Sequence, residues 1–311
     1  MMYIINIWKS CHESLYNKNN EFYLESIKNL GFNSIALWGF YDEKFIEIAK
    51  NFGLYIYSLI PTVIDESDLE KFELSSTIDG DSIKQISLNG SKEWSENCIN
   101  IINNNDLVDE WIITDRKWYW MVMPSSNELW IKFPFHGEKD LEILLKNGIN
   151  LPYCADFKQF GEEWYNKFQN KFYELYLSRF DIILEYCSLN NIKTSIPLVF
   201  HKSIRESCCN MGSCNVLENY ISKYKPNIFA LNATMNSKKW FIKMKNKYNV
   251  KLYGGTEDLT GLVNNKNGRK LLKYGFDGTI SNEHQLTNNS NPKWDDIISE
   301  MKFIKENYNE Q

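Results

Sequence analysis

The stretch SIALWGFYDEKFIEIAKNFGLYIYSLI, residues 34–60, decides the fold class. Within it, Ser34–Phe40 is a short apolar run that predicts a buried strand. Glu43–Asn51 has the spacing of an amphipathic helix, and Gly53 closes that helix. Leu54–Ile60 is a second apolar run of strand length. Two apolar strands joined by a helix that ends in glycine are typical of a parallel sheet.

The same alternation of strand and helix recurs along the chain. The strand candidates are Tyr3–Trp8, Ser34–Phe40, Leu54–Ile60, Glu110–Thr114, Thr194–Phe200, Ile228–Asn232, Val250–Tyr253 and Thr279–Ser281. The helix candidates are Glu21–Leu30, Glu43–Asn51, Glu96–Asn104, Gly161–Asn190, Val216–Tyr224, Lys238–Tyr248, Gly268–Tyr274 and Pro292–Asn307. Eight βα units predict an α/β protein of the (β/α)8 TIM-barrel class.

The loops after the third and fourth strands are long. Residues 62–93 contain Asp79-Gly80 between two extended runs, which indicates a hairpin insertion. Residues 116–155 form a second long excursion, placed at the barrel mouth. We therefore expect one barrel domain over residues 1–311. The competing architecture is an open doubly wound sheet, but the loop after the first strand, Lys9–Glu13, lacks the glycines of a phosphate-binding turn.

Composition favours a globular protein and argues against two classes of partner. The chain of 311 residues is 43% hydrophobic and 24% charged, with a formal net charge of −5. A mildly acidic chain without a Lys/Arg block argues against nucleic acid as a partner. No run approaches the roughly 18 apolar residues of a membrane span. The oligomeric state stays open.

Cysteine usage and the N-terminus point to one compartment. The seven cysteines are odd in number and irregularly spaced, which favours free thiols in a reducing environment. The first residues lack a basic segment followed by a long apolar stretch, so they do not resemble a signal peptide. These features predict a cytoplasmic location.

Aromatic residues are unusually frequent, with 10 Trp and 18 Tyr. Flat aromatic faces serve as stacking platforms for ligands, although many aromatic side chains simply belong to the core. Trp8 ends the first predicted strand, and Trp38 lies near the end of the second. Trp118 and Trp120 lie in the polar loop after the fourth strand. These four tryptophans are candidate platforms for a sugar ring, with burial against the barrel as the alternative.

Barrel enzymes build their sites from residues just past the carboxyl ends of the strands. Asp115 follows the fourth strand and Glu257 follows the seventh, which supplies carboxylates from two separate strands. Glycoside cleavage needs two such groups, one to protonate the leaving oxygen and one to attack or to activate water. His201, Asn232 and Glu283, which follow the fifth, sixth and eighth strands, complete the candidate substrate-binding set.

Each carboxylate also has a plainer interpretation. Asp115 is followed by Arg116 and Lys117, and a salt bridge to one of them or to a neighbouring strand is the favoured alternative. Glu257 can be a carboxylate at the start of a helix. Glu283, and Glu128 in the long loop after the fourth strand, are reserve carboxylates.

The layout resembles the clan of (β/α)8 retaining glycoside hydrolases, and most of all the catalytic domain of family 42-type β-galactosidases. The similarity is carried by ALWGF at residues 36–40, SKEWSENCIN at 91–100, and the long segment FGEEWYNKFQNKFYELYLSRFDIILEYC at 160–187. The resemblance implies an acid/base residue at Asp115, a nucleophile at Glu257, a carbohydrate substrate and no cofactor.

The chain departs from that family at the end of the fourth strand. The family has Asn-Glu there, whereas this chain has Thr114-Asp115. An aspartate reaches about 1.5 Å less far than a glutamate, because it is one C–C bond shorter. A displacement of about this size is enough to cost a hundredfold in rate.

Two other functions compete with hydrolysis. A catalytically degenerate barrel would bind sugars without cleaving them. A phosphate-ligand enzyme of the isomerase or aldolase type would use glycines near the seventh and eighth strands, and the chain has Gly254-Gly255 and Gly278 there. A metal site is disfavoured, because the adjacent Cys208 and Cys209 chelate one ion poorly.

Overall fold

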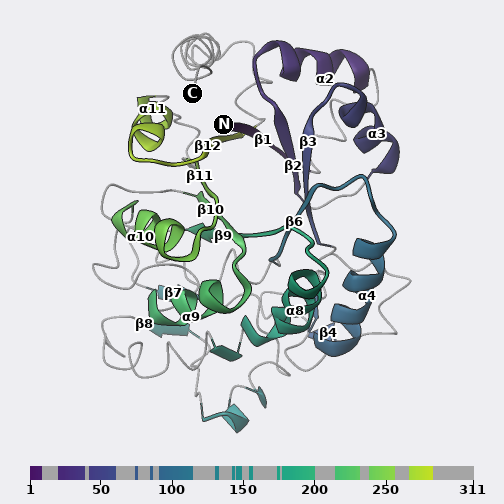
Figure 1. Cartoon of the computed structure of the whole chain (residues 1–311). Coiled ribbons are helices and arrows are strands. Elements are labelled where there is room, and N and C mark those ends of the chain that lie inside the picture. Colours follow the sequence, from purple (N-terminus) through teal and green to yellow (C-terminus); the bar gives the residue numbers. More distant parts are fainter. Residues whose placement is uncertain are drawn as a thin grey trace.

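The fold is a closed barrel of eight parallel strands (Figure 1). The computed structural model describes residues 1–8, 20–38, 42–60, 74–75, 85–86, 91–114, 130–132, 142–143, 145–148, 154–156, 174–175, 177–199, 214–231, 238–255 and 266–282. The barrel strands are β1 (Met2–Trp8), β2 (Ser34–Trp38), β3 (Tyr55–Leu59), β6 (Glu110–Ile112), β9 (Thr194–Val199), β10 (Asn227–Leu231), β11 (Leu252–Gly255) and β12 (Gly278–Asn282). The expected TIM-barrel class is confirmed.

Helices between the strands lie around the outside of the barrel (Figure 1). They are α2 (Asn20–Asn29), α3 (Glu43–Asn51), α4 (Ser91–Asn103), α8 (Asp181–Leu189), α9 (Cys214–Tyr224), α10 (Lys238–Tyr248) and α11 (Lys266–Lys273). Within the described residues, none of the helices combines the length and the apolar character that crossing a membrane requires.

Closure of the barrel joins the first strand to the last. β1 pairs with β2 on one side and with β12 on the other, both in parallel. The register sets Met2 beside Gly278 and Asn6 beside Asn282. A side chain at Gly278 would meet the Met2 carbonyl oxygen at 2.0 Å, so the two strands need glycine here.

Alternation along the strands separates two sets of buried side chains. Ile4, Tyr57, Phe229 and their neighbours face the barrel interior and form one cluster. Tyr3, Ile5 and other side chains of the opposite faces pack under the helices. Strands covered on both faces read as continuous apolar runs, which is why the sequence reveals them so clearly.

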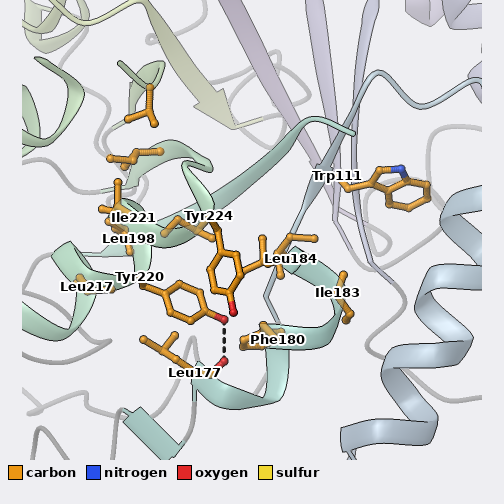
Figure 2. Close-up of a cluster of buried hydrophobic side chains, with 14 of the residues drawn as sticks. Trp111, Leu177, Phe180, Ile183, Leu184, Leu198, Leu217, Tyr220, Ile221 and Tyr224 are labelled. Atoms are coloured by element: carbon orange, nitrogen blue, oxygen red, sulfur yellow. Dashed lines mark hydrogen bonds between the residues drawn. The ribbon is translucent and has the colours of Figure 1, made fainter. Parts of the chain in front are cut away.

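The apolar layer beneath α8 and α9 is shown in Figure 2. Tyr220 lies within it, and its hydroxyl donates a hydrogen bond to the Leu177 carbonyl at 2.8 Å (Figure 2). The segment Ser178–Phe180 is a 3-10 helix rather than a continuation of one α-helix through residue 190. In this tighter turn the Leu177 carbonyl forms no ordinary α-helical hydrogen bond, so it can accept the one from the Tyr220 side chain.

The long loops contain two small antiparallel sheets. Strand β4 (Leu74–Ser75) pairs with β5 (Gln85–Ile86), within the segment expected to form a hairpin. Strand β7 (Trp130–Lys132) pairs with β8 (Cys154–Asp156), within or just past the second excursion. Asp79-Gly80 and the final helix expected at 292–307 lie outside the described residues, so the extent of both insertions stays a prediction.

Helix ends are built in one recurring way. Gly31, Gly53 and Gly275 have positive φ angles of 99°, 68° and 94°. After each of them an apolar residue turns inward and donates its N–H five residues back, as Phe32 does to the Ile27 carbonyl at 3.3 Å. This is the Schellman arrangement, which satisfies helix carbonyls and sends the chain into the next strand.

Candidate functional site

The carboxyl ends of the eight strands define one rim, because all strands run in the same direction. Asn6, Trp38 and Thr114 lie near this rim and are buried, with exposed fractions of 0%, 5% and 4%. Gly255 ends β11 at the same rim. The chain continues from Thr114 into Asp115, and from Gly255 through Thr256 into Glu257.

The order of strands fixes which strand ends are neighbours at the rim. β6, which leads to Asp115, and β11, which leads to Glu257, are separated by β9 and β10. The strand directly across the barrel from β6 is β12, which ends at Asn282, just before Glu283. Strand order therefore sets the ends of β6, β11 and β12 at three separate points of one rim.

Most of the predicted site residues follow strands in parts of the chain that the structure does not describe. Those outside the described residues are Asp115, Trp118, Trp120, His201, Asn232, Glu257 and Glu283, together with the reserve Glu128. Their roles stay predictions. The described residues hold no group of three or more His, Cys, Asp and Glu side chains suited to a metal ion.

Two of the predicted stacking residues fall within the described chain. Trp8 and Trp38 are register partners at the ends of β1 and β2. The indole of Trp38 belongs to the inner cluster with Ile4 and Tyr57, and is only 5% exposed. This indole caps the core beneath the rim, and its contact with a sugar stays a prediction.

Sequence reasoning missed Asn6, a polar side chain in the middle of an apolar strand. It is fully buried and lies in register with Ala36 on one side and Asn282 on the other. Ile4, two residues earlier, faces the barrel interior, so alternation directs Asn6 inward as well. An isolated asparagine in MYIINIW was the signal available in the sequence.

A second polar group lies at the opposite end of the barrel. Glu110 is the first residue of β6, and its side chain is 1% exposed. The Asn227 side-chain amide donates to Glu110 Oε1 at 3.0 Å, and the Tyr55 hydroxyl donates to Oε2 at 3.3 Å. Lys193 Nζ, at the surface, donates to the Tyr55 hydroxyl at 3.4 Å.

Burial governs the electrostatics of Glu110 and its hydrogen-bond partners, which we call the basal group. Removal from water raises the pKa of Glu110 to about 7, although hydrogen bonds from Asn227 and Tyr55 and the charge of Lys193 oppose the shift. Burial, reinforced by the charge of Glu110, also raises the pKa values of Tyr55 and Tyr57. The tyrosines are therefore neutral, while Glu110 titrates near neutrality.

This basal group was also missed by sequence reasoning. Alternation through EWIIT places Glu110 and Ile112 on one face and Trp111 on the other. Ile112 belongs to the inner cluster and Trp111 to the outer one, so Glu110 faces inward. Sites in barrels lie at the carboxyl ends of the strands, so Glu110 stands apart from the candidate rim.

The glycines considered for phosphate binding have structural explanations in the barrel wall. A Cβ on Gly254 would lie 2.6 Å from the Phe276 ring, and a Cβ on Gly255 would lie 3.0 Å from Ile280. Gly278 begins β12, at the base of the barrel. All three are buried strand residues, so their presence does not by itself indicate a phosphate loop.

Comparison with known proteins supports the fold alone. The sequence matches no family model, and no curated protein matches it. Among solved structures, the catalytic domain of a β-amylase from Paenibacillus polymyxa is similar with a TM-score of 0.63 and 15% identity, over 93% of this chain and 94% of that one.

Two further structures extend this comparison. A β-galactosidase from the psychrophilic Marinomonas ef1 has a TM-score of 0.52 and 10% identity, over 90% of this chain and 53% of that one. A sugar phosphate isomerase/epimerase from Parabacteroides distasonis has a TM-score of 0.50 and 10% identity, over 98% of this chain and 94% of that one. The chain thus shares the TIM-barrel fold with structures of different activities.

Proposed function

We propose that this protein binds a carbohydrate at the carboxyl-end rim of its barrel and cleaves a glycosidic bond there. The observation that carries the proposal is the closed parallel barrel, in which β6 and β11 end at one rim. Asp115 comes three residues after the end of β6, and Glu257 comes two residues after the end of β11. Two carboxylates around one opening are the arrangement that glycoside hydrolysis requires.

The proposed mechanism is a retaining displacement. Glu257 attacks the anomeric carbon, while Asp115 gives its proton to the departing glycosidic oxygen. The resulting glycosyl ester on Glu257 is then hydrolysed by a water whose proton returns to Asp115. Trp38, Trp118, Trp120, His201, Asn232 and Glu283 are proposed to contact the sugar, with Trp8 at the same rim.

Similarity in fold supports a carbohydrate as the substrate class. The β-amylase and the β-galactosidase are both named for the cleavage of glycosidic bonds, and the β-amylase domain matches nearly the whole chain. The alternative is a rim that binds sugar without cleaving it, which the shortened side chain of Asp115 favours. A phosphate-ligand enzyme is a further alternative, represented by the sugar phosphate isomerase/epimerase.

The test is hydrolysis of a panel of nitrophenyl α- and β-glycosides and of maltooligosaccharides. We expect wild type to cleave one class of glycoside, and Glu257→Gln to lose at least about a thousandfold in kcat, because the nucleophile is removed. Glu96→Gln serves as the matched control, since Glu96 is an exposed glutamate on the outer helix α4, away from the rim. Equal losses in both variants, or an unaffected Glu257→Gln, would contradict the assignment of the nucleophile.

A separate test concerns Asp115, which stands where the family 42-type β-galactosidases have a glutamate. Asp115→Asn removes the proton donor, so nitrophenyl substrates, which have good leaving groups, should lose less than oligosaccharides do. Asp115→Glu restores the longer reach and should raise kcat if the short side chain limits protonation. If calorimetry shows that wild type and Asp115→Glu bind a sugar that neither of them hydrolyses, the protein is a sugar-binding barrel and not an enzyme.

The stereochemical outcome separates a retaining mechanism from an inverting one. In a retaining enzyme the carboxyl groups lie about 5–5.5 Å apart, and in an inverting one about 6.5–9.5 Å apart. Proton NMR of the first product formed identifies its anomeric configuration. Retention supports Glu257 as the nucleophile, whereas inversion would make it a base that activates water.

A further inference from the structure

The carboxyl group of Glu110 is surrounded by neutral hydrogen-bond donors inside the barrel wall. Asn227 on β10 and Tyr55 on β3 bond to its two oxygens at 3.0 and 3.3 Å, and Ser195 on β9 lies beside it. Among the residues that the structure describes, Glu110 forms no ion pair. An ionised carboxylate is expensive to bury without a cation beside it, so this arrangement is close to balanced between the two protonation states.

A continuous hydrogen-bonded route leads from Glu110 to the surface. The Tyr55 hydroxyl contacts Glu110 on one side, and it accepts a hydrogen bond from Lys193 Nζ at 3.4 Å on the other. The Lys193 ammonium also lies 5.4 Å from the centre of the Tyr55 ring. Tyr55 is half-buried and Lys193 is exposed, so the route ends in solvent.

The remaining titratable groups around Glu110 are accounted for. Tyr57 on β3 and Tyr253 on β11 have pKa values raised chiefly by burial, so both are neutral. Asp109, the preceding residue, accepts hydrogen bonds from Lys50 Nζ at 2.7 Å and from the Ile56 amide at 2.7 Å. Within the described residues, then, Asp109 has a cation partner and Glu110 has none.

We propose that Glu110 is a proton-binding centre at the base of the barrel, which exchanges its proton with solvent at Tyr55 and changes charge within the folded protein. On deprotonation, the proton passes from the Glu110 carboxyl to water and leaves a carboxylate. The carboxylate accepts a hydrogen bond from the Tyr55 hydroxyl, and its negative charge attracts the Lys193 ammonium to the Tyr55 oxygen. On protonation this attraction is lost and Lys193 is released. The inference does not rest on the proposed hydrolytic function.

The shifted pKa agrees with this geometry. Burial is the largest influence and raises the pKa of Glu110 to about 7, so both charge states are populated near neutral pH. The bonds from Asn227 and Tyr55 and the charge of Lys193 all favour the ionised form. Removing Tyr55 or Lys193 should therefore raise the pKa of Glu110 still further.

The experiment is carbon NMR of the full chain labelled at the glutamate carboxyl carbons, titrated from about pH 3 to about pH 9 so that both the ordinary and the shifted range are covered. Glu110→Gln identifies the resonance, and we expect its midpoint in wild type near neutrality. Glu218→Gln is the matched control, because Lys247 holds the pKa of Glu218 below its usual range. A Glu110 resonance that titrates in the ordinary range of an exposed glutamate would overturn the proposal.

Two further variants test the route to the surface and need no Glu110 substitution. Lys193→Met and Tyr55→Phe should each move the near-neutral midpoint upward, which also identifies the resonance if Glu110→Gln fails to fold. Lys223→Met, which removes an ammonium over the Tyr224 ring on α9, should leave it unchanged. A midpoint that is the same in Lys193→Met as in wild type would show that Glu110 is not coupled to the basal surface.

Discussion

Among the described residues, three other than glycine adopt the left-handed conformation at helix ends. Asn191, Lys225 and Asn249 have φ angles of 56°, 51° and 54°. They occupy the position that Gly31, Gly53 and Gly275 fill after other helices. A side chain in this region costs about 1–2 kcal/mol, and asparagine tolerates it better than most residues do. Lys225 is thus the most strained of the three.

Replacing Lys225 with glycine should stabilise the protein. We expect Lys225→Gly to raise the free energy of unfolding by up to about 1 kcal/mol, because strain at the end of α9 is relieved. The measurement is urea unfolding followed by circular dichroism. Lys223→Gly, within the last turn of the same helix, is the control and should lower stability by about 1 kcal/mol or less. A loss of stability at both positions would contradict the proposed strain.

The buried carboxyl of Glu110 predicts a pH dependence of stability. Its pKa rises from 4.5 to about 7 on folding, so the unfolded chain ionises first. Stability is therefore highest below about pH 4.5 with respect to this group and falls as the pH rises to about 7. We expect Glu110→Gln to match wild type at low pH and to exceed it by up to about 3 kcal/mol at pH 8. Urea midpoints measured at several pH values test this, and parallel curves for the two proteins would contradict it.

At the scale of elements, acidic and amide side chains form hydrogen bonds that join neighbouring strands at the ends where the strands begin. Asp109 donates its backbone N–H to the Ile56 carbonyl at 3.0 Å and accepts the Ile56 N–H on its side chain at 2.7 Å. Asp277 repeats both bonds with Leu252, and Asn33 repeats them with Tyr3. The same device thus joins three pairs of adjacent strands at the basal end of the barrel.

The two interactions of Asp109 should differ in energy. Asp109→Ala leaves the Ile56 amide without its acceptor and is expected to cost about 1–3 kcal/mol. Lys50→Met removes a partly exposed ion pair and should cost less than about 1 kcal/mol. Urea unfolding of both single variants and of the double variant measures the difference. If Lys50→Met proved the more damaging, the ion pair rather than the backbone bond would hold β3 and β6 together.

At the scale of the whole molecule, the barrel depends on how its first and last strands meet. A Cβ at Gly278 would lie 2.0 Å from the Met2 carbonyl oxygen, whereas one at Gly255 would lie 3.0 Å from Ile280. Overpacking typically costs about 1–3 kcal/mol. Both glycines meet a backbone oxygen, so the much shorter contact at Gly278 is the harder one to relieve. We expect Gly278→Ala to cost more stability than Gly255→Ala.

The measurement is thermal unfolding of both alanine variants beside wild type. Gly53→Ala provides a comparison in which space is available, since the nearest atom is Lys28 Nζ at 3.8 Å, and only the φ of 68° is unfavourable. Equal losses at Gly278 and Gly53 would mean that backbone conformation, and not closure of the barrel, explains the glycine at residue 278.

Sequence alone was sufficient for the fold class and for most of the barrel elements that the structure describes. Helices α3 and α10 begin and end where hydrophobic spacing predicted, and each barrel strand overlaps its predicted run. These features are local, because burial on both faces makes a strand apolar throughout and a left-handed residue ends a helix. The positions of Asp115 and Glu257 just past two strands follow from the same local pattern.

Tertiary structure decided everything that depends on which strands are neighbours. Glu110 meets Tyr55, Ser195 and Asn227 only because β3, β9 and β10 lie beside or near β6 in the closed barrel. The need for glycine at residue 278 likewise appears only when β12 pairs with β1. Such contacts join residues far apart in the chain, and no periodicity in the sequence encodes them. Local pattern therefore determined the parts of this barrel, and closure determined the environment of each side chain inside it.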